Sequence, residues 1–136
     1  MKTLTIVMLF IIMSVPTSVR AEVDGARAIN AIIGEAEGEP YNGKLAVACA
    51  IRNREQSRKG HGLKGVYGER SPRVKLAGKK AREDSRRAWE ASSDSDACEF
   101  IDGADHWEGT AFKTPYWAKD MVITSTIGNQ RFYRRK

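Results

Sequence analysis

Three glutamates, Glu35, Glu37 and Glu39, lie at alternate positions between two apolar segments of a chain that is otherwise rich in cations. Ala31 and Ile32 precede Glu35 at helical spacing, so a helix would surround its carboxyl group with small and apolar side chains. Apolar surroundings and nearby like charges both raise the pKa of a carboxyl group. A carboxyl group that stays protonated near neutral pH can act as the general acid that a glycosidase needs. Spacing alone, however, favours the simpler interpretation of three ordinary glutamates on a helix surface.

Two helices joined by a short turn are expected to position these acids. The first is predicted over about 24–37 with Asp24 as its N-cap, and Gly38 and Pro40 end it. The second is predicted over 43–54 with Asn42 as its cap, and it is apolar nearly all round, as in a buried helix. The first helix carries one apolar stripe at helical spacing, formed by Ile29, Ile32, Ile33 and Ala36. Glu35 lies at the edge of that stripe, whereas Glu37 points toward solvent.

The rest of the chain predicts one further helix and a hairpin. Residues 55–80 are rich in Gly, Lys and Arg, and we interpret them as a basic surface loop. A third helix is predicted over about 79–92. Residues 122–127 are rich in β-branched side chains, and the pair Gly128-Asn129 is typical of a two-residue turn before a returning strand at 130–133. A helical lobe followed by a small antiparallel element indicates an α+β fold.

The N-terminal segment is typical of a secretory signal peptide. Lys2 is followed by an apolar segment from Leu4 to Val15, which is shorter than the about 20 residues that a membrane-spanning helix needs. We predict a signal peptide over 1–21 and a single domain over 22–136. That domain would be exported to the periplasm, the cell wall or the medium, and would keep no membrane span. An uncleaved N-terminal anchor is the alternative.

Charge and cysteine content narrow the classes of partner and the compartment. The formal net charge is +6, and an excess of cations suits a polyanion such as nucleic acid, anionic lipid or cell-wall polymer. Cys49 and Cys98 are the only cysteines, and an even number in an exported chain favours a disulfide. An unpaired, buried Cys49 is the alternative. No zinc-ligand spacing is present, so we expect no metal.

Three motifs, in order along the chain, carry a resemblance to one family. They are GEAEGEPYNGKLAVACAIRNR at 34–54, GADHWEG at 103–109 and WAKDMVITSTIGNQRFYRR at 117–135. Together they resemble the motifs of the SleB/CwlJ-type cell wall hydrolases, a family of peptidoglycan-cleaving enzymes. Gln130 stands where a histidine is frequent in that family, and the segment 55–80 matches it poorly.

The resemblance implies a small lysozyme-like α+β domain with a helical lobe and a short antiparallel hairpin. It implies cleavage of the β-1,4 bond between N-acetylmuramic acid and N-acetylglucosamine in peptidoglycan glycan strands, and it maps the catalytic acid onto Glu35. The family is similar to lytic transglycosylases, in which one glutamate protonates the glycosidic oxygen and then takes a proton from the muramic C6 hydroxyl, which closes a 1,6-anhydro ring. A muramidase-type hydrolase would need a second carboxylate, for which Asp105 is the candidate.

Three further polar residues are candidates for substrate binding, each with a structural alternative. Glu39 would orient the substrate or Glu35, or would accept a backbone hydrogen bond at the helix joint. Asn53 would bind an N-acetyl group or, more simply, the facing loop. A lone histidine is usually structural, and only the motif places His106 in the groove.

Three aromatic residues, Trp107, Tyr116 and Trp117, are candidates for stacking on sugar faces, although a small domain needs at least one of them in its core. A non-catalytic exported protein that binds wall polymer is the alternative from another class. The aromatic residues do not interleave with the basic loop as they do on nucleic-acid-binding surfaces, so no nucleic acid partner is expected. We expect a monomer that uses no cofactor.

Overall fold

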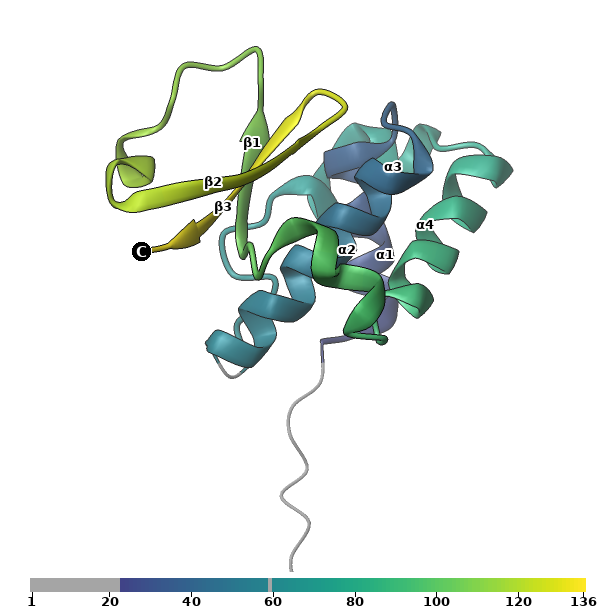
Figure 1. The fold of residues 1–136 in the computed structure, drawn as a ribbon. Coiled ribbons are helices and arrows are strands. Elements are labelled where there is room, and N and C mark those ends of the chain that lie inside the picture. Colours follow the sequence, from purple (N-terminus) through teal and green to yellow (C-terminus); the bar gives the residue numbers. More distant parts are fainter. Residues whose placement is uncertain (1–22, 59) are drawn as a thin grey trace, which may run out of the picture.

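The computed structural model describes residues 23–58 and 60–136, so the signal peptide predicted at 1–21 lies outside the described residues. Helices gather on one side of the molecule and a small sheet lies on the other (Figure 1), which confirms the predicted α+β class. None of the described helices is long and apolar enough to cross a membrane. The elements in chain order are α1 (Gly25–Ala36), α2 (Tyr41–Ser57), η1 (Gly68–Arg70), α3 (Pro72–Leu76), α4 (Lys79–Ala91), η2 (Asp96–Ile101), β1 (His106–Gly109), η3 (Tyr116–Asp120), β2 (Met121–Ile127) and β3 (Gln130–Arg135).

We call residues 35–39, which contain the three glutamates, the acidic segment. The helices on its two sides, α1 and α2, differ in how well the sequence predicts them. α1 begins as expected, because the Asp24 carboxylate accepts two backbone N–H bonds from the first turn. α2 begins earlier than predicted, at Tyr41, because Pro40 takes the N-cap position with φ −60° and its missing N–H costs nothing at a helix start. Asn42 therefore lies inside the first turn, and its prediction as the cap was wrong. α2 also continues past the predicted end, to Ser57.

The middle of α2 forms the centre of the hydrophobic core. Residues 46–51 are fully buried, as the apolar pattern of the segment predicts. Ile32 of α1 and Trp89 of α4 pack against them from neighbouring helices. A disulfide joins Cys49 to Cys98, as predicted, and so attaches α2 to η2.

The sheet has three antiparallel strands in the order β1-β3-β2. β2 and β3 form the predicted hairpin, with Gly128 and Asn129 as its turn. The sequence does not predict β1, because its four residues lack the apolar and polar alternation that marks a strand. Phe132 and Tyr133 of β3 are fully buried, and Phe132 joins the core between the sheet and the helices.

The segment 55–80, predicted as a loop, contains the end of α2 and two short helices. Ser71 caps α3 by accepting the backbone N–H of Arg73 at 3.3 Å. Glu69 of η1 forms an ion pair with Arg27 of α1, with 2.8 Å between Oε1 and a guanidinium nitrogen. η1 is therefore fixed against α1, the helix that ends in the acidic segment.

Candidate active site

Glu35 lies in the last turn of α1, half-buried, with both carboxylate oxygens hydrogen-bonded. Oε1 accepts the backbone N–H of Gly68 at 2.8 Å, and Oε2 accepts the Nε1–H of Trp107 at 3.2 Å. These donors come from η1 and β1, so three separate segments of the chain meet at this group. The surroundings are therefore more polar than the apolar neighbours that the helical spacing predicts. A carboxylate offers about four lone-pair positions, so each oxygen can still bind a further partner.

Two glycines allow the close contact between α1 and η1. A Cβ on Gly34 would lie 1.8 Å from the carbonyl oxygen of Gly68, and a Cβ on Gly68 would lie 2.6 Å from Cγ of Glu35. Either side chain would push η1 away from α1. Glycine at both positions therefore lets the N–H of Gly68 reach the Glu35 carboxylate.

The main chain of Glu35 is held from the sheet. Nε2 of Gln130, the first residue of β3, donates to the Glu35 carbonyl oxygen at 2.7 Å, and Gln130 is buried. Its Oε1 has no hydrogen-bond partner among the described residues. The sequence marks Gln130 only as a departure from the family pattern. In the structure, Gln130 contacts the main chain of Glu35, the candidate catalytic residue.

Glu35 lines a cleft of about 900 Å³, which lies within the usual range of ligand-binding sites. The cleft is formed by α1, the end of α2, the segment 61–67, β1 and η3. Of the lining residues that the structure describes, Glu35 is the only one with a carboxyl group. Four further residues predicted from the sequence line the same cleft, namely His106, Trp107, Tyr116 and Trp117.

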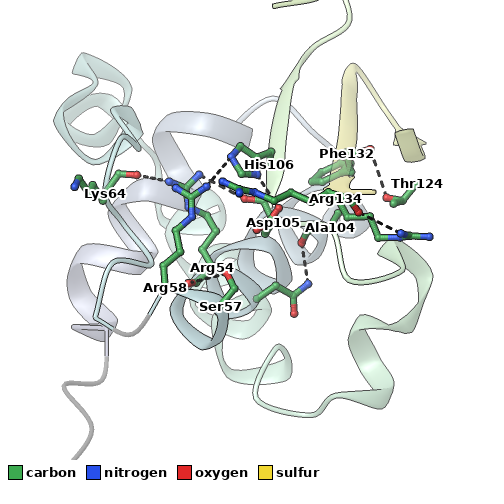
Figure 2. Close-up of polar contacts among 12 residues, drawn as sticks. Arg54, Ser57, Arg58, Lys64, Ala104, Asp105, His106, Thr124, Phe132 and Arg134 are labelled. Atoms are coloured by element: carbon green, nitrogen blue, oxygen red, sulfur yellow. Dashed lines mark hydrogen bonds and ion pairs between the residues drawn. The ribbon is translucent and has the colours of Figure 1, made fainter. Parts of the chain in front are cut away.

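Cations form one wall of this cleft. Arg54 and Arg58, both labelled in Figure 2, lie one helical turn apart at the end of α2, and the charge of Arg58 acts on that of Arg54. Arg54 donates to the carbonyl oxygens of Asp105, at 3.5 Å, and of Lys64. Burial lowers the pKa of Arg54, and the adjacent Arg58 adds to this effect, while Asp105 and Glu35 act in the opposite direction.

Asp105, the candidate for a second catalytic carboxylate, is bonded to His106. Its Oδ1 lies 2.7 Å from His106 Nδ1, and His106 Nε2 lies 3.2 Å from a nitrogen of Arg58 (Figure 2). The tautomer with the proton on Nδ1 satisfies both contacts, because an arginine only donates. Burial acts to raise the pKa of Asp105, but the hydrogen bond with His106 and nearby positive charges, Arg58 and Arg54 among them, outweigh it, and the pKa lies below its ordinary value. Asp105 is buried and does not line the cleft.

The aromatic residues of the cleft divide into packed and exposed ones. Trp107 is half-buried and donates to Glu35. Trp117 packs against the ring of His106 with 5.3 Å between ring centroids. Tyr116 and Tyr67, in contrast, are 83% and 75% exposed. These two rings are therefore free to contact a ligand in the cleft.

Glu39 and Asn53 lie outside the cleft and make structural contacts. Oε2 of Glu39 accepts the N–H of Asn129 at 3.1 Å, which ties the joint between α1 and α2 to the hairpin turn. Nδ2 of Asn53 donates to the carbonyl oxygen of Ala104 at 2.8 Å and so anchors the residues that precede β1. Glu39 and Asn53 thus make the structural contacts that were given as the alternatives to substrate binding.

Several residues at the site escaped the sequence prediction. They are Arg54, Arg58, Lys64, Tyr67 and Gly68. All but Arg54 follow the predicted end of the second helix, in the segment interpreted as a surface loop. One signal was available, because Arg54 and Arg58 are four residues apart and would share a face if the helix were extended.

Comparisons with known proteins find similarity in three-dimensional structure. No family model and no curated protein matches the sequence. The catalytic domain of the Bacillus cereus SleB protein is similar in structure, with a TM-score of 0.60 and 22% sequence identity over 81% of this chain and 88% of that chain. The catalytic domain of the germination-specific lytic transglycosylase SleB from Bacillus anthracis has a TM-score of 0.60 and 22% identity over 88% of this chain and 100% of that chain. The resemblance stated from three sequence motifs is thus confirmed in three dimensions: this chain has the fold of the SleB catalytic domain.

Proposed function

We propose that this chain is an exported peptidoglycan-degrading enzyme that cleaves the β-1,4 bond between N-acetylmuramic acid and N-acetylglucosamine, as a lytic transglycosylase with Glu35 as its catalytic residue. The observation that carries the proposal is the placement of Glu35. Its carboxyl group is held by two N–H donors and lines a cleft with exposed tyrosines, in a fold shared with a domain described as a lytic transglycosylase.

The set of acids in the cleft favours a mechanism that uses one carboxyl group. A two-carboxylate hydrolase needs acids about 5 Å or 6.5–9.5 Å apart across the scissile bond. Among the described residues that line the cleft, only Glu35 has a carboxyl group. Asp105 is buried and bonded to His106, which leaves it poorly placed to act on a sugar.

In the proposed reaction, protonated Glu35 gives its proton to the glycosidic oxygen while the bond from that oxygen to C1 of N-acetylmuramic acid breaks. The C6 hydroxyl oxygen of the same sugar forms a new bond to C1, and its proton passes to Glu35. No water is consumed, and Glu35 returns to its starting state. The N–H groups of Gly68 and Trp107 hold the carboxylate in place between the two proton transfers and stabilise its charge.

Substitution of Glu35 tests this proposal. Glu35→Gln keeps the size of the side chain but cannot transfer a proton, so release of soluble fragments from purified sacculi should fall at least about 10²-fold. The variant should still fold, with a slightly lower unfolding temperature, because the amide nitrogen of Gln would face one of the two N–H donors, Gly68 or Trp107. Glu37→Gln is the matched control, because Glu37 is half-buried near the same helix end but does not line the cleft. Full activity of the Glu35→Gln protein would overturn the proposal.

The products distinguish transglycosylation from hydrolysis. Mass spectrometry of wild-type digests should show 1,6-anhydro fragments, each lighter by one water than the corresponding hydrolysis product. Reducing-end products would instead require a second carboxylate, and Asp105→Asn would be the first variant to test. Retention on sacculi without any release of fragments would support a non-catalytic wall-binding protein.

Export is part of the proposal, with 1–21 as a cleaved signal peptide and 22–136 as the mature, monomeric domain. The mass of the protein recovered from the periplasm or the medium tests the cleavage site directly. A protein that stays in the membrane fraction with its full mass would instead indicate the uncleaved anchor.

A further inference from the structure

Arg54 and Arg58 carry positive charges that form no ion pair with any carboxylate of the described residues. Arg54 lines the cleft although it is only 8% exposed, and its Nε is buried without a partner among these residues. Its terminal nitrogens donate to the carbonyl oxygens of Asp105 and Lys64, and Arg58 donates to the ring of His106. Burial and the neighbouring charge of Arg58 both disfavour the positive charge of Arg54, and Asp105 and Glu35 offset these effects only in part, so the pKa of Arg54 stays lowered. An anion bound next to Arg54 and Arg58 would offset both the burial of the Arg54 charge and its repulsion from Arg58.

The balance of charge in the cleft points the same way. Lys64 is exposed and lines the cleft, so it adds a third cation to Arg54 and Arg58. We call these three residues the cationic wall. These three cations face at most two negative charges, those of Glu35 and of the buried Asp105, whose charge the neutral His106 does not cancel. The cleft therefore presents a net positive charge to the substrate at the start of the reaction.

We propose that the cationic wall binds carboxylates of the peptide attached to muramic acid, so that the cleft prefers glycan strands that bear anionic peptides. This inference rests on the proposed function. The N-acetylated glycan is itself neutral, so the carboxylates close to the scissile bond belong to these peptides. Arginine suits them, because its planar guanidinium donates two parallel hydrogen bonds to a carboxylate. A phosphate polymer on the muramic C6 oxygen fits less well, because it would block the hydroxyl that the proposed reaction uses.

The test uses two ligands of matched size. Each is a tetrasaccharide of the glycan with its peptides, with the peptide carboxyl groups free in one and converted to carboxamides in the other. Binding is measured by calorimetry with the Glu35→Gln protein, which does not consume the ligand. The free-acid ligand should bind about tenfold more tightly, the gain typical of one charge-assisted hydrogen-bonded pair. That ratio should shrink as salt is raised.

Substitutions then assign the preference to the cationic wall. Arg58→Gln, added to Glu35→Gln, should bring the ratio of the two affinities close to one, and Arg58→Lys should restore part of it. Arg73→Gln is the matched control, because Arg73 is exposed on α3 and does not line the cleft, and it should leave the ratio unchanged. A thermal unfolding scan of each variant checks that it is folded.

Wild-type cleavage of the same two ligands separates this inference from the proposed function. Equal affinities for the free-acid and carboxamide ligands, with both cleaved by the wild type, would overturn the cationic wall as a peptide site and leave the proposed function standing. A tenfold preference in binding without cleavage of either ligand would leave the anion site standing and overturn the proposed function.

Discussion

Gly68→Ala would move Glu35 away from one of the two donors that hold its carboxyl group. The new Cβ would lie 2.6 Å from Cγ of Glu35, 2.7 Å from the carbonyl oxygen of Ala31 and 2.8 Å from Oε1 of Glu35. Two of these atoms belong to the Glu35 side chain itself, and the third belongs to the main chain of α1. The substitution therefore acts both on the carboxyl group proposed as catalytic and on the packing of η1 against α1.

The size of the effect follows from these distances. Carbon atoms pack at about 3.5 Å or more, so η1 or Glu35 has to retreat by roughly 1 Å. The hydrogen bond from Gly68 to Glu35, now 2.8 Å long, would not survive that shift. A misplacement of about 1 Å costs on the order of 10²-fold in rate. Overpacking should destabilise the fold by about 1–3 kcal/mol. Alanine also restricts the unfolded chain, which stabilises the fold by about 0.4–1 kcal/mol. The free energy of unfolding should therefore fall by about 1–2 kcal/mol.

The assay compares release of soluble fragments from sacculi with thermal unfolding for the same variant. Gly38→Ala is the matched control, because Gly38 lies in the same acidic segment, does not adopt a positive φ and would place its Cβ with nothing within 4 Å. That variant should be as active as the wild type and slightly more stable. Wild-type rate and wild-type Tm for Gly68→Ala would refute the view that contact between η1 and α1 positions Glu35.

Reduction of the Cys49–Cys98 disulfide, which spans a sequence separation of 49, should cost up to about 4 kcal/mol of unfolding free energy and lower Tm by about 10 °C or more in a calorimetric scan. Free thiols in protein recovered from the periplasm or the medium would contradict the bond. Burial and the hydrogen bond to Glu108 raise the pKa of Tyr133 to about 12. In the unfolded chain the pKa of this tyrosine is about 10, so its contribution to stability is complete below about pH 10 and is lost as the pH rises toward 12. Denaturant titrations at alkaline pH should show this loss for the wild type and not for Tyr133→Phe. Retention of the protein on anionic wall polymer should weaken between low and physiological salt, because the segment 54–87 is rich in cations; retention that does not change with salt would mean that contacts in the cleft supply the affinity.

The sequence predicts the elements whose signals are local. The N-cap Asp24 and the apolar stripe of α1 identify that helix, because each depends on residues within a turn or two of one another. The pair Gly128-Asn129 identifies the hairpin for the same reason. Glu35 could be chosen as the candidate acid because its position at the end of a helix and its motif can both be read along the chain.

Elements with weak local signals were missed. The first turn of α2 was assigned to a loop, because Asn42 is a good N-cap by type while Pro40 takes that position through its fixed φ. β1 has only four residues and exists as a strand because β3 supplies its hydrogen-bond partners. The helices η1 and α3 are too short to be predicted from periodicity.

The surroundings of Glu35 were decided by tertiary structure alone. Its two hydrogen-bond donors are 33 and 72 residues away in the sequence, and Gln130, which holds its carbonyl, is 95 residues away. No spacing along the chain shows that Gly68 can approach α1, because that approach depends on the absence of a side chain on Gly34 as well. The residue type and the position of Glu35 along α1 thus mark it as an acid that could transfer a proton. What it can bond to, and which charges face it across the cleft, follow only from segments that packing brings together.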